Sequence, residues 1–204
     1  MNPFLKPELQ RNLVLASASE RRREILERLG FEFEVFVTGV NEDGILCPHP
    51  TGFAMLAAGR KASEAHEARP DATIIAADTI VVCGEARLGK PSDGADAAGM
   101  LRLLSGRRHE VITGVSVFGP DGTCIGGFEQ THVYFRELSE RVIARYIETG
   151  EPFGKAGAYA IQGYAASFVE KIDGCYFNVV GLPVNRLFRL LVEVGRNADD
   201  HPDR

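Results

Sequence analysis

Residues 73–91 read TIIAADTIVVCGEARLGKP, and the chain on either side can be interpreted from this segment. The apolar run before Gly84 predicts a β-strand, and the glycine and polar residues after it predict that the chain turns back. One carboxylate, Asp78, interrupts the run. The two-residue period of a strand puts it on the same face as Ile74, Ala76, Ile80 and Val82. A carboxylate there must be neutralised, paired with a cation or bound to a metal ion.

Lys90, at the end of the segment that turns back, is a candidate partner for Asp78 if the two segments form a hairpin. Two interpretations are open: a structural Asp–Lys pair, or a carboxylate between a cation and a phosphate-bound metal, where it can also accept a proton from water. Residues 84–91 also imitate the phosphate loop G-x-x-x-x-G-K-[ST]. However, Pro91 replaces the hydroxyl residue that would hold Mg²⁺ and removes a backbone N–H, so we reject a P-loop.

A second informative segment is LVLASASERRREILERL, residues 13–29. It predicts a short strand, a serine turn and a helix that begins after Ser19 and ends at Gly30. Arg21 and Arg22 lie in the first turn, four residues before apolar positions, so both face the protein body. Cations at a helix N-terminus repel the helix dipole, unless an anion such as phosphate lies there. The alternative is a solvated basic face.

The remaining elements intermix without a strict repeat. Expected strands cover 31–40, the two arms of a hairpin within 109–138 and much of 155–183; expected helices cover 53–68, 92–104, 139–150 and a last segment opened by Pro183. This order predicts an α/β fold with a mixed, twisted central sheet, antiparallel hairpins and flanking helices. We expect a single domain over residues 1–204 with an active-site cleft between two lobes, and a frayed tail at 196–204.

Bulk composition excludes some classes of function. The chain has 204 residues, 45% of them hydrophobic, and 23 basic against 28 acidic side chains, for a formal charge of -5. This balance argues against general binding to nucleic acid or an anionic membrane. The start MNPFLKPELQRN lacks the apolar core of a signal peptide, and no apolar stretch approaches the roughly 20 residues that span a bilayer, so we expect a cytoplasmic protein. The cysteines at positions 47, 83, 124 and 175 are scattered, as is typical of free thiols.

Three further polar residues are ambiguous from local pattern alone. Lys61 lies on the same helix face as Ala54, Ala57 and Ala65 rather than with the solvent-facing charges. A surface lysine whose chain lies along the protein while its ammonium reaches solvent is nevertheless the commoner case. Glu42 lies in a loop and is either solvated or helps to hold a divalent ion. Gln162 is a lone amide among small and apolar residues, so it either satisfies backbone groups or reads the edge of a ligand.

Taken together, several ordered motifs resemble the Maf family of nucleotide pyrophosphatases, also called septum-formation-inhibitor-like proteins. The motifs are LASASERRREIL, RKA, AADTIVV with GKP, GRRHEVITGV, and TGEPFGKAGAYAIQG followed by NVVGLP. The resemblance runs from about Asn12 to Val194. It implies hydrolysis of a nucleoside triphosphate between the α and β phosphates, to a monophosphate and pyrophosphate, with a divalent cation, Mg²⁺ or Mn²⁺.

The resemblance also implies roles for single residues. Ser17, Arg22, Lys61 and Lys90 match phosphate-binding positions; Glu42 and Asp78 match the acidic pair that holds the metal, with Asp78 also the proton acceptor; Arg21, Thr79 and Gln162 match positions associated with base choice. The expected partner is a nucleoside triphosphate substrate, with neither nucleic acid nor a membrane. The resemblance is compatible with a homodimer.

The IQG motif is similar to that of the branch acting on dTTP and UTP. An amide at Gln162 can match the N3–H and O4 edge that uracil and thymine share, so we expect activity on both, and modified pyrimidine nucleotides are further candidates. We also expect, from the resemblance, a role in removing non-canonical nucleotides. Competing interpretations are a non-catalytic nucleotide sensor in cell-division control and a phosphotransferase, the latter weakened by the missing P-loop.

Overall fold

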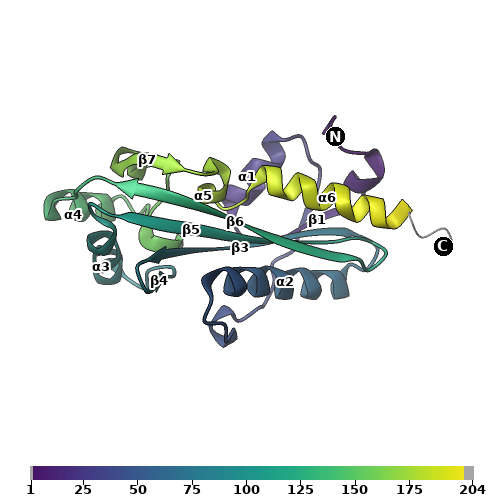
Figure 1. The fold of residues 1–204 in the computed structure, drawn as a ribbon, viewed down its shortest axis with the longest axis horizontal. Helices are drawn as coiled ribbons and strands as arrows, with labels where there is room; N and C mark the ends of the chain where they lie inside the picture. Colours follow the sequence, from purple (N-terminus) through teal and green to yellow (C-terminus); the bar gives the residue numbers. More distant parts are fainter. Residues whose placement is uncertain (1, 200–204) are drawn as a thin grey trace. The chain divides into compact units, whose positions relative to one another are not determined.

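The computed structural model describes residues 2–199, which form a mixed α/β fold around a seven-stranded sheet (Figure 1). The strands are β1 (Leu13–Ala16), β2 (Glu34–Val35), β3 (Thr73–Cys83), β4 (Ala86–Leu88), β5 (Arg108–Phe118), β6 (Cys124–Phe135) and β7 (Val169–Asp173). The α-helices are α1 (Glu20–Arg28), α2 (Pro50–Ala68), α3 (Gly94–Leu104), α4 (Glu140–Glu148), α5 (Tyr176–Val180) and α6 (Val184–Asp199). Short 3₁₀ segments are η1 (Pro7–Gln10), η2 (Glu42–Gly44), η3 (Ala156–Ala158) and η4 (Tyr164–Phe168). None of these described helices has the length and apolarity needed to cross a bilayer.

The sheet combines parallel and antiparallel pairs in the order β2-β1-β3-β5-β6-β7, with β4 paired to β3 outside this path. Strand β1 runs parallel to both β2 and β3, and Leu13 of β1 lies opposite Thr73 of β3. The pairs β3–β4 and β6–β7 are antiparallel. The predicted mixed sheet with antiparallel hairpins is therefore confirmed.

The described chain separates into two compact units. Unit 1 comprises residues 2–78, 113–129 and 181–199, and unit 2 comprises residues 79–112 and 130–180. The expectation of one domain over the whole chain stays a prediction.

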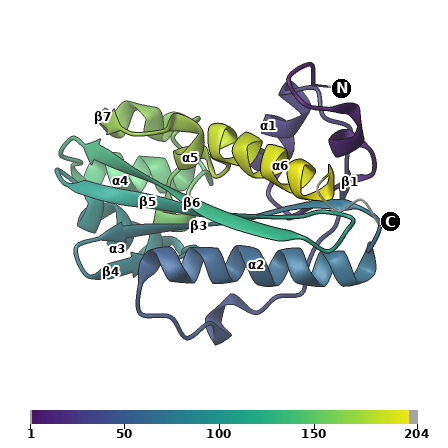
Figure 2. The same ribbon diagram turned by 45° about the vertical axis from the view of Figure 1, so that its right-hand side comes forward.

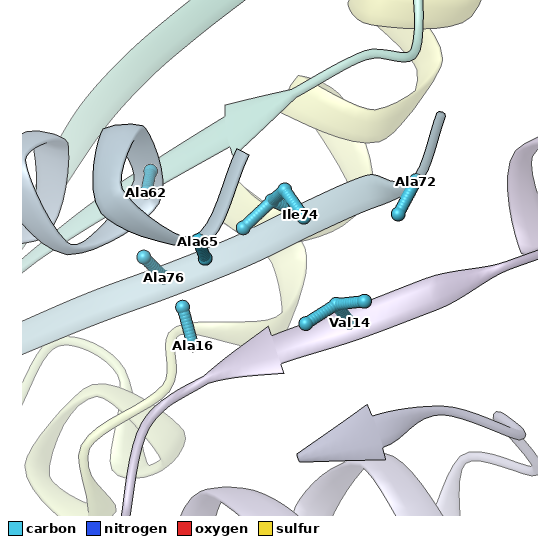
Figure 3. Close-up of a cluster of buried hydrophobic side chains, with 7 residues drawn as sticks. All are labelled: Val14, Ala16, Ala62, Ala65, Ala72, Ile74 and Ala76. Carbon is cyan, nitrogen blue, oxygen red and sulfur yellow. The ribbon is translucent and has the colours of Figure 1, made fainter. Parts of the chain in front are cut away.

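In unit 1, helix α2 lies close against β1 and β3 because the contact is made largely of small side chains. Figure 3 shows Ala62 and Ala65 of α2 above the strands; the cluster is completed by Val14, Ala16, Ala72, Ile74 and Ala76. A Cβ added at Gly114 of β5 would lie 2.3 Å from the Ala54 carbonyl oxygen, so the α2 backbone also touches this strand directly. Close packing of this kind fixes the side chains that α2 presents to the sheet.

Helix α6 covers the opposite face of the sheet in unit 1 (Figure 2). Neighbouring strand residues point to opposite faces, and a Cβ at Gly126 would face Met55 of α2 whereas one at Gly127 would face Arg186 of α6. The apolar stripe predicted for the last helix is confirmed, since Leu187, Leu190, Leu191 and Val194 are all buried. The helix continues to Asp199, and the rest of the expected frayed tail, residues 200–204, lies outside the described residues.

Unit 2 holds the end of β3 from Thr79 onward, the strand β4 that pairs with it, and the helices α3 and α4. Helix α3 begins after Asp93, whose carboxylate accepts a hydrogen bond from Asp96 N, rather than at Ser92 as expected. Helices α3 and α4 are joined by a two-point ion pair between Arg102 and Glu140. His109 is buried in an aromatic cluster with Phe135 and Tyr159, and its Nε2 lies 2.9 Å from the Tyr159 hydroxyl.

Two predicted strands are wrong over most of their length. Of residues 31–40 only Glu34–Val35 form a strand, because the partner β1 has just four residues before it bends into the serine turn. Residues 155–183 form 3₁₀ segments, the short β7 and α5 in place of a long strand. Left-handed backbone at Gly157 and Ala158 turns the chain there.

Candidate functional site

Two carboxylates converge on one ammonium group in unit 1. Lys61 Nζ donates to Glu42 Oε1 at 2.6 Å and to Asp78 Oδ1 at 2.7 Å. The Lys61 and Asp78 side chains are 11% and 7% exposed, whereas that of Glu42 is 36% exposed. The cluster therefore has a buried side and a side open to solvent.

Each member of this cluster comes from a different element. Lys61 is on α2, one turn from Ala57 and Ala65, both fully buried against the sheet. Asp78 is in the middle of β3, and the charge that interrupts the apolar strand is met by this lysine. Glu42 opens the short η2 turn that precedes α2. The alanine contact between α2 and β3 thus carries Lys61 to the carboxylate.

The turn between β1 and α1 builds a second polar group in the same unit. Arg22 Nη1 donates to Ser17 Oγ at 2.9 Å, and Arg22 Nε donates to the Gly181 carbonyl at 2.8 Å. Ser17 Oγ also accepts from Ser19 N at 3.2 Å. Arg22 is 8% exposed and Ser17 6%. The guanidinium is consequently held in one orientation with its fork beside the N-terminus of α1, an arrangement that suits an anion.

Electrostatic coupling links the two groups. Burial lowers the pKa of the Arg22 guanidinium to about 10, opposed in part by the negative charges of Asp78 and Glu42 and assisted by the neighbouring Arg21. Arg22 is still charged at neutral pH. Three cations and two carboxylates therefore act on one another here, and an anionic ligand would relieve the repulsion between Arg21 and Arg22.

The three consecutive arginines of α1 differ in their surroundings. Arg22 is buried and Arg21 is half-buried, while Arg23 is exposed and pairs with Glu20 and Glu27 on the helix surface. The prediction that two arginines of the first turn face the protein body is confirmed for Arg22, and Arg21 is partly covered. A wholly solvated basic face is excluded.

The donor set fits a divalent cation of the Mg²⁺ type. Such ions take oxygen ligands, commonly one or two carboxylates together with substrate phosphates. Glu42 and Asp78 supply two carboxylates aimed at the same place, since both reach the Lys61 ammonium. Among the side chains that the structure describes, which do not include that of Asp43, no three or more from His, Cys, Asp or Glu gather to form a metal site from protein ligands alone.

Thr79, Lys90 and Gln162 belong to unit 2. Thr79 follows Asp78 in β3 and is half-buried. Lys90 is exposed and lies two residues beyond β4; the register that pairs Val81 with Leu88, continued by two residues, brings position 90 opposite position 79. Gln162 is exposed in a turn between Ala160 and Gly163. The hairpin predicted for residues 73–91 is thus confirmed.

The structure corrects two expectations about charged partners. Local pattern favoured a surface position for Lys61, which is wrong: the residue is 9% exposed and bonded to both carboxylates. Lys90 was the expected cation for Asp78, and the partner observed is Lys61. Sequence reasoning also missed the Gly181 carbonyl that holds Arg22; the NVVGLP motif contains this residue, but no local signal links it to α1.

Comparisons with known proteins agree with the motifs. The family described as Maf-like protein matches residues 12–194. A dTTP/UTP pyrophosphatase of Pelotomaculum thermopropionicum is 46% identical over 92% of this chain and 99% of the relative, and one of a Geobacillus species is 44% identical over 91% and 99%. The solved Ham1 protein of Staphylococcus aureus is 17% identical, with a TM-score of 0.43 over 61% of this chain and 72% of that one, too slight a likeness to support an argument. The sequence match and the relatives together show that the chain belongs to the Maf family.

Proposed function

We propose that this protein is a nucleoside triphosphate pyrophosphatase that hydrolyses dTTP and UTP to the monophosphate and pyrophosphate. The observation that carries the proposal is the convergence of Glu42 and Asp78 on Lys61, in the same unit as the buried Arg22–Ser17 pair. This combination supplies a proton acceptor, two carboxylate ligands for a metal ion, and cations held in place to bind phosphates. Relatives called dTTP/UTP pyrophosphatases, at 44–46% identity, support the choice of substrate.

In the proposed reaction Asp78 orients and deprotonates the attacking water. One Asp78 oxygen is bonded to Lys61, which holds the carboxylate in place and leaves the other oxygen to take the proton. Lys61, Arg22 and Ser17 bind phosphate oxygens and stabilise the charge that develops on the leaving pyrophosphate. Glu42 and Asp78 would hold Mg²⁺ or Mn²⁺, which when bound neutralises and orients the triphosphate.

The roles of the remaining candidates are part of the proposal and rest on the family resemblance. Lys90 is assigned to phosphate binding, and Arg21, Thr79 and Gln162 to recognition of the base. The exposed amide of Gln162 has both a donor and an acceptor, as the uracil and thymine edge requires. We further infer a cytoplasmic location, where nucleotides are abundant and the four free thiols stay reduced, clearance of modified pyrimidine nucleotides, and a homodimer that light scattering can test.

Steady-state release of pyrophosphate tests the proposal. We expect activity on both dTTP and UTP, with kcat/KM values that differ by at most about a few hundredfold because the two bases differ by a single methyl group. We expect much lower values for 7-methyl-GTP. Asp78→Asn should lower kcat by roughly 10² to 10⁴ with little change in nucleotide affinity. Near-normal turnover in this variant would remove Asp78 from the role of base. Tight nucleotide binding without any pyrophosphate release by the wild type would favour the sensor interpretation.

A further inference from the structure

The turn that carries Gln162 has an unusual set of hydrogen bonds in unit 2. It is closed by a hydrogen bond from Gly163 N to the Ala160 carbonyl at 3.0 Å. On its N-terminal side, Ala160 N donates to the Tyr146 hydroxyl at 3.2 Å. Both ends of this turn lie outside the β-ladders, so its backbone groups need other partners.

One side-chain pair supplies those partners on both sides of the turn. The Tyr146 hydroxyl that accepts from Ala160 N also donates to Glu151 Oε1 at 2.8 Å. The Glu151 carboxylate in turn accepts from Tyr164 N at 2.9 Å and from Ala165 N at 3.2 Å, just after the turn. A continuous chain of hydrogen bonds therefore runs from residue 160 through Tyr146 and Glu151 to residues 164–165.

The surroundings make this arrangement rigid. Tyr146 is 3% exposed and packs edge-on against Phe168 with ring centroids 5.0 Å apart. Burial and the hydrogen bond to Glu151 raise the pKa of the Tyr146 phenol, so the hydroxyl keeps the proton that it donates. Glu151 lies so close to the turn that a Cβ added at Gly163 would lie 2.0 Å from Glu151 Oε2 and would displace the carboxylate.

From this geometry we infer that Tyr146 and Glu151 are positioning residues for base recognition: they clamp the turn 160–163 and so fix the place from which the Gln162 amide meets the nucleotide base. The inference rests on the proposed function, which gives Gln162 its ligand. Neither residue touches the base in this account; both act through the backbone of the turn. Fixed placement matters because a hydrogen-bonding group displaced by about 1 Å loses much of its contribution.

The test uses two near-isosteric variants and one matched control. Glu151→Gln replaces one acceptor oxygen by a donor that faces a backbone N–H, and Tyr146→Phe removes the hydroxyl that joins the two halves of the clamp. Ser139→Ala is the control, because it removes the N-cap of the same helix α4 without touching the turn. Hydrogen exchange of the amides in residues 160–165 should become about tenfold faster in both clamp variants and stay near wild type in the control.

The second readout is the ratio of kcat/KM for UTP to kcat/KM for N3-methyl-UTP, which lacks the N3–H donor. We expect the clamp variants to lower this ratio by about tenfold or more, mainly through KM for UTP, and the control to leave it unchanged. In a Gln162→Ala background, Glu151→Gln should change the ratio by less than about twofold, because the clamp then has nothing left to position.

The possible failures are distinguishable. Unchanged exchange in residues 160–165 of both clamp variants would refute the clamp itself. An undiminished effect of Glu151→Gln in the Gln162→Ala background would show a merely structural role and overturn the inference. If the wild type releases pyrophosphate but Gln162→Ala keeps the wild-type ratio, base recognition by Gln162 is wrong and the positioning role falls with it. A wild type without pyrophosphatase activity would refute the proposed function and that role, whereas the exchange experiment still decides whether the clamp exists.

Discussion

Replacing Lys61 by methionine should destabilise the protein more than any exposed charge substitution. The change keeps most of the side-chain volume and removes the ammonium that Asp78 meets at 2.7 Å. Because Asp78 is 5% exposed, its carboxylate would be left in the interior without the cation that it contacts directly. Breaking a buried ion pair from one side costs about 3–5 kcal/mol. The opening toward solvent at Glu42 places our expected value at the lower end, about 3 kcal/mol.

The structure also predicts how much Glu42 and Asp78 each contribute to the loss of stability when Lys61 is replaced. Glu42→Gln should cost at most about 1 kcal/mol, because the Glu42 side chain is 36% exposed and water replaces the lost interaction. The double variant Lys61→Met/Asp78→Asn should be more stable than Lys61→Met alone, since no unpaired charge remains. A coupling energy of about 2 kcal/mol between positions 61 and 78 is therefore expected.

Urea unfolding followed by circular dichroism at equal m-values measures the wild type, the double variant and the single variants Lys61→Met, Glu42→Gln and Asp78→Asn. The assay needs no substrate, so it is independent of the proposed activity. A loss below about 1 kcal/mol for Lys61→Met, or a double variant whose loss equals the sum of the single losses, would refute the claim that Lys61 neutralises a buried Asp78.

Three further predictions concern the frame of the site and of unit 2. Arg22→Lys cannot reach both Ser17 Oγ and the Gly181 carbonyl, so it should lose about 2 kcal/mol of stability and weaken nucleotide binding; calorimetry that finds neither change would contradict the observed contacts. Gly114→Ala would place a Cβ 2.3 Å from the Ala54 carbonyl oxygen and should lower the free energy of unfolding in urea by about 3 kcal/mol. The control is Gly122→Ala, which lies in open space at positive φ and therefore tests backbone strain without a clash. Burial lowers the pKa of His109 from 6.5 to about 4. Between these pH values the unfolded chain binds a proton that the folded chain does not, so the free energy of unfolding falls as the pH drops from 6.5 to 4. The expected loss is roughly 3 kcal/mol, at about 1.36 kcal/mol per pKa unit. His109→Gln should flatten that part of the stability profile, and an unchanged slope would count against burial as its origin.

Much of the fold could be predicted because periodicity and end signals are local. The segment around Ser19 and Gly30 gave the bounds of α1, and the apolar line from Leu187 to Val194 gave the buried face of α6. The strand predicted for residues 31–40 was wrong over most of its length because the neighbouring strand is too short to pair with all of it. The strand predicted around Gln162 was wrong because side chains, rather than a neighbouring strand, accept the backbone hydrogen bonds there.

The residues of the candidate site could be predicted from the sequence, but the ion pairs between them could not. The pattern of β3 indicated that Asp78 needs a partner, yet it pointed to Lys90 because only neighbours in sequence are visible to such reasoning. Lys61 reaches Asp78 through the packing of α2 on the sheet, a contact made by alanines that carry no chemical signal of their own. The clamp by Tyr146 and Glu151 was missed for the same reason, since neither residue interrupts a local pattern.

The most direct test of the central claim is the identity of the products. Purified protein is incubated with dTTP, or with UTP, and Mg²⁺ or Mn²⁺, and the phosphorus-containing products are identified by ³¹P NMR, with Asp78→Asn as the matched control. The account predicts the nucleoside monophosphate and pyrophosphate in equal amounts, lost in the variant. Nucleoside diphosphate and orthophosphate would show that a different bond is cleaved and would contradict it.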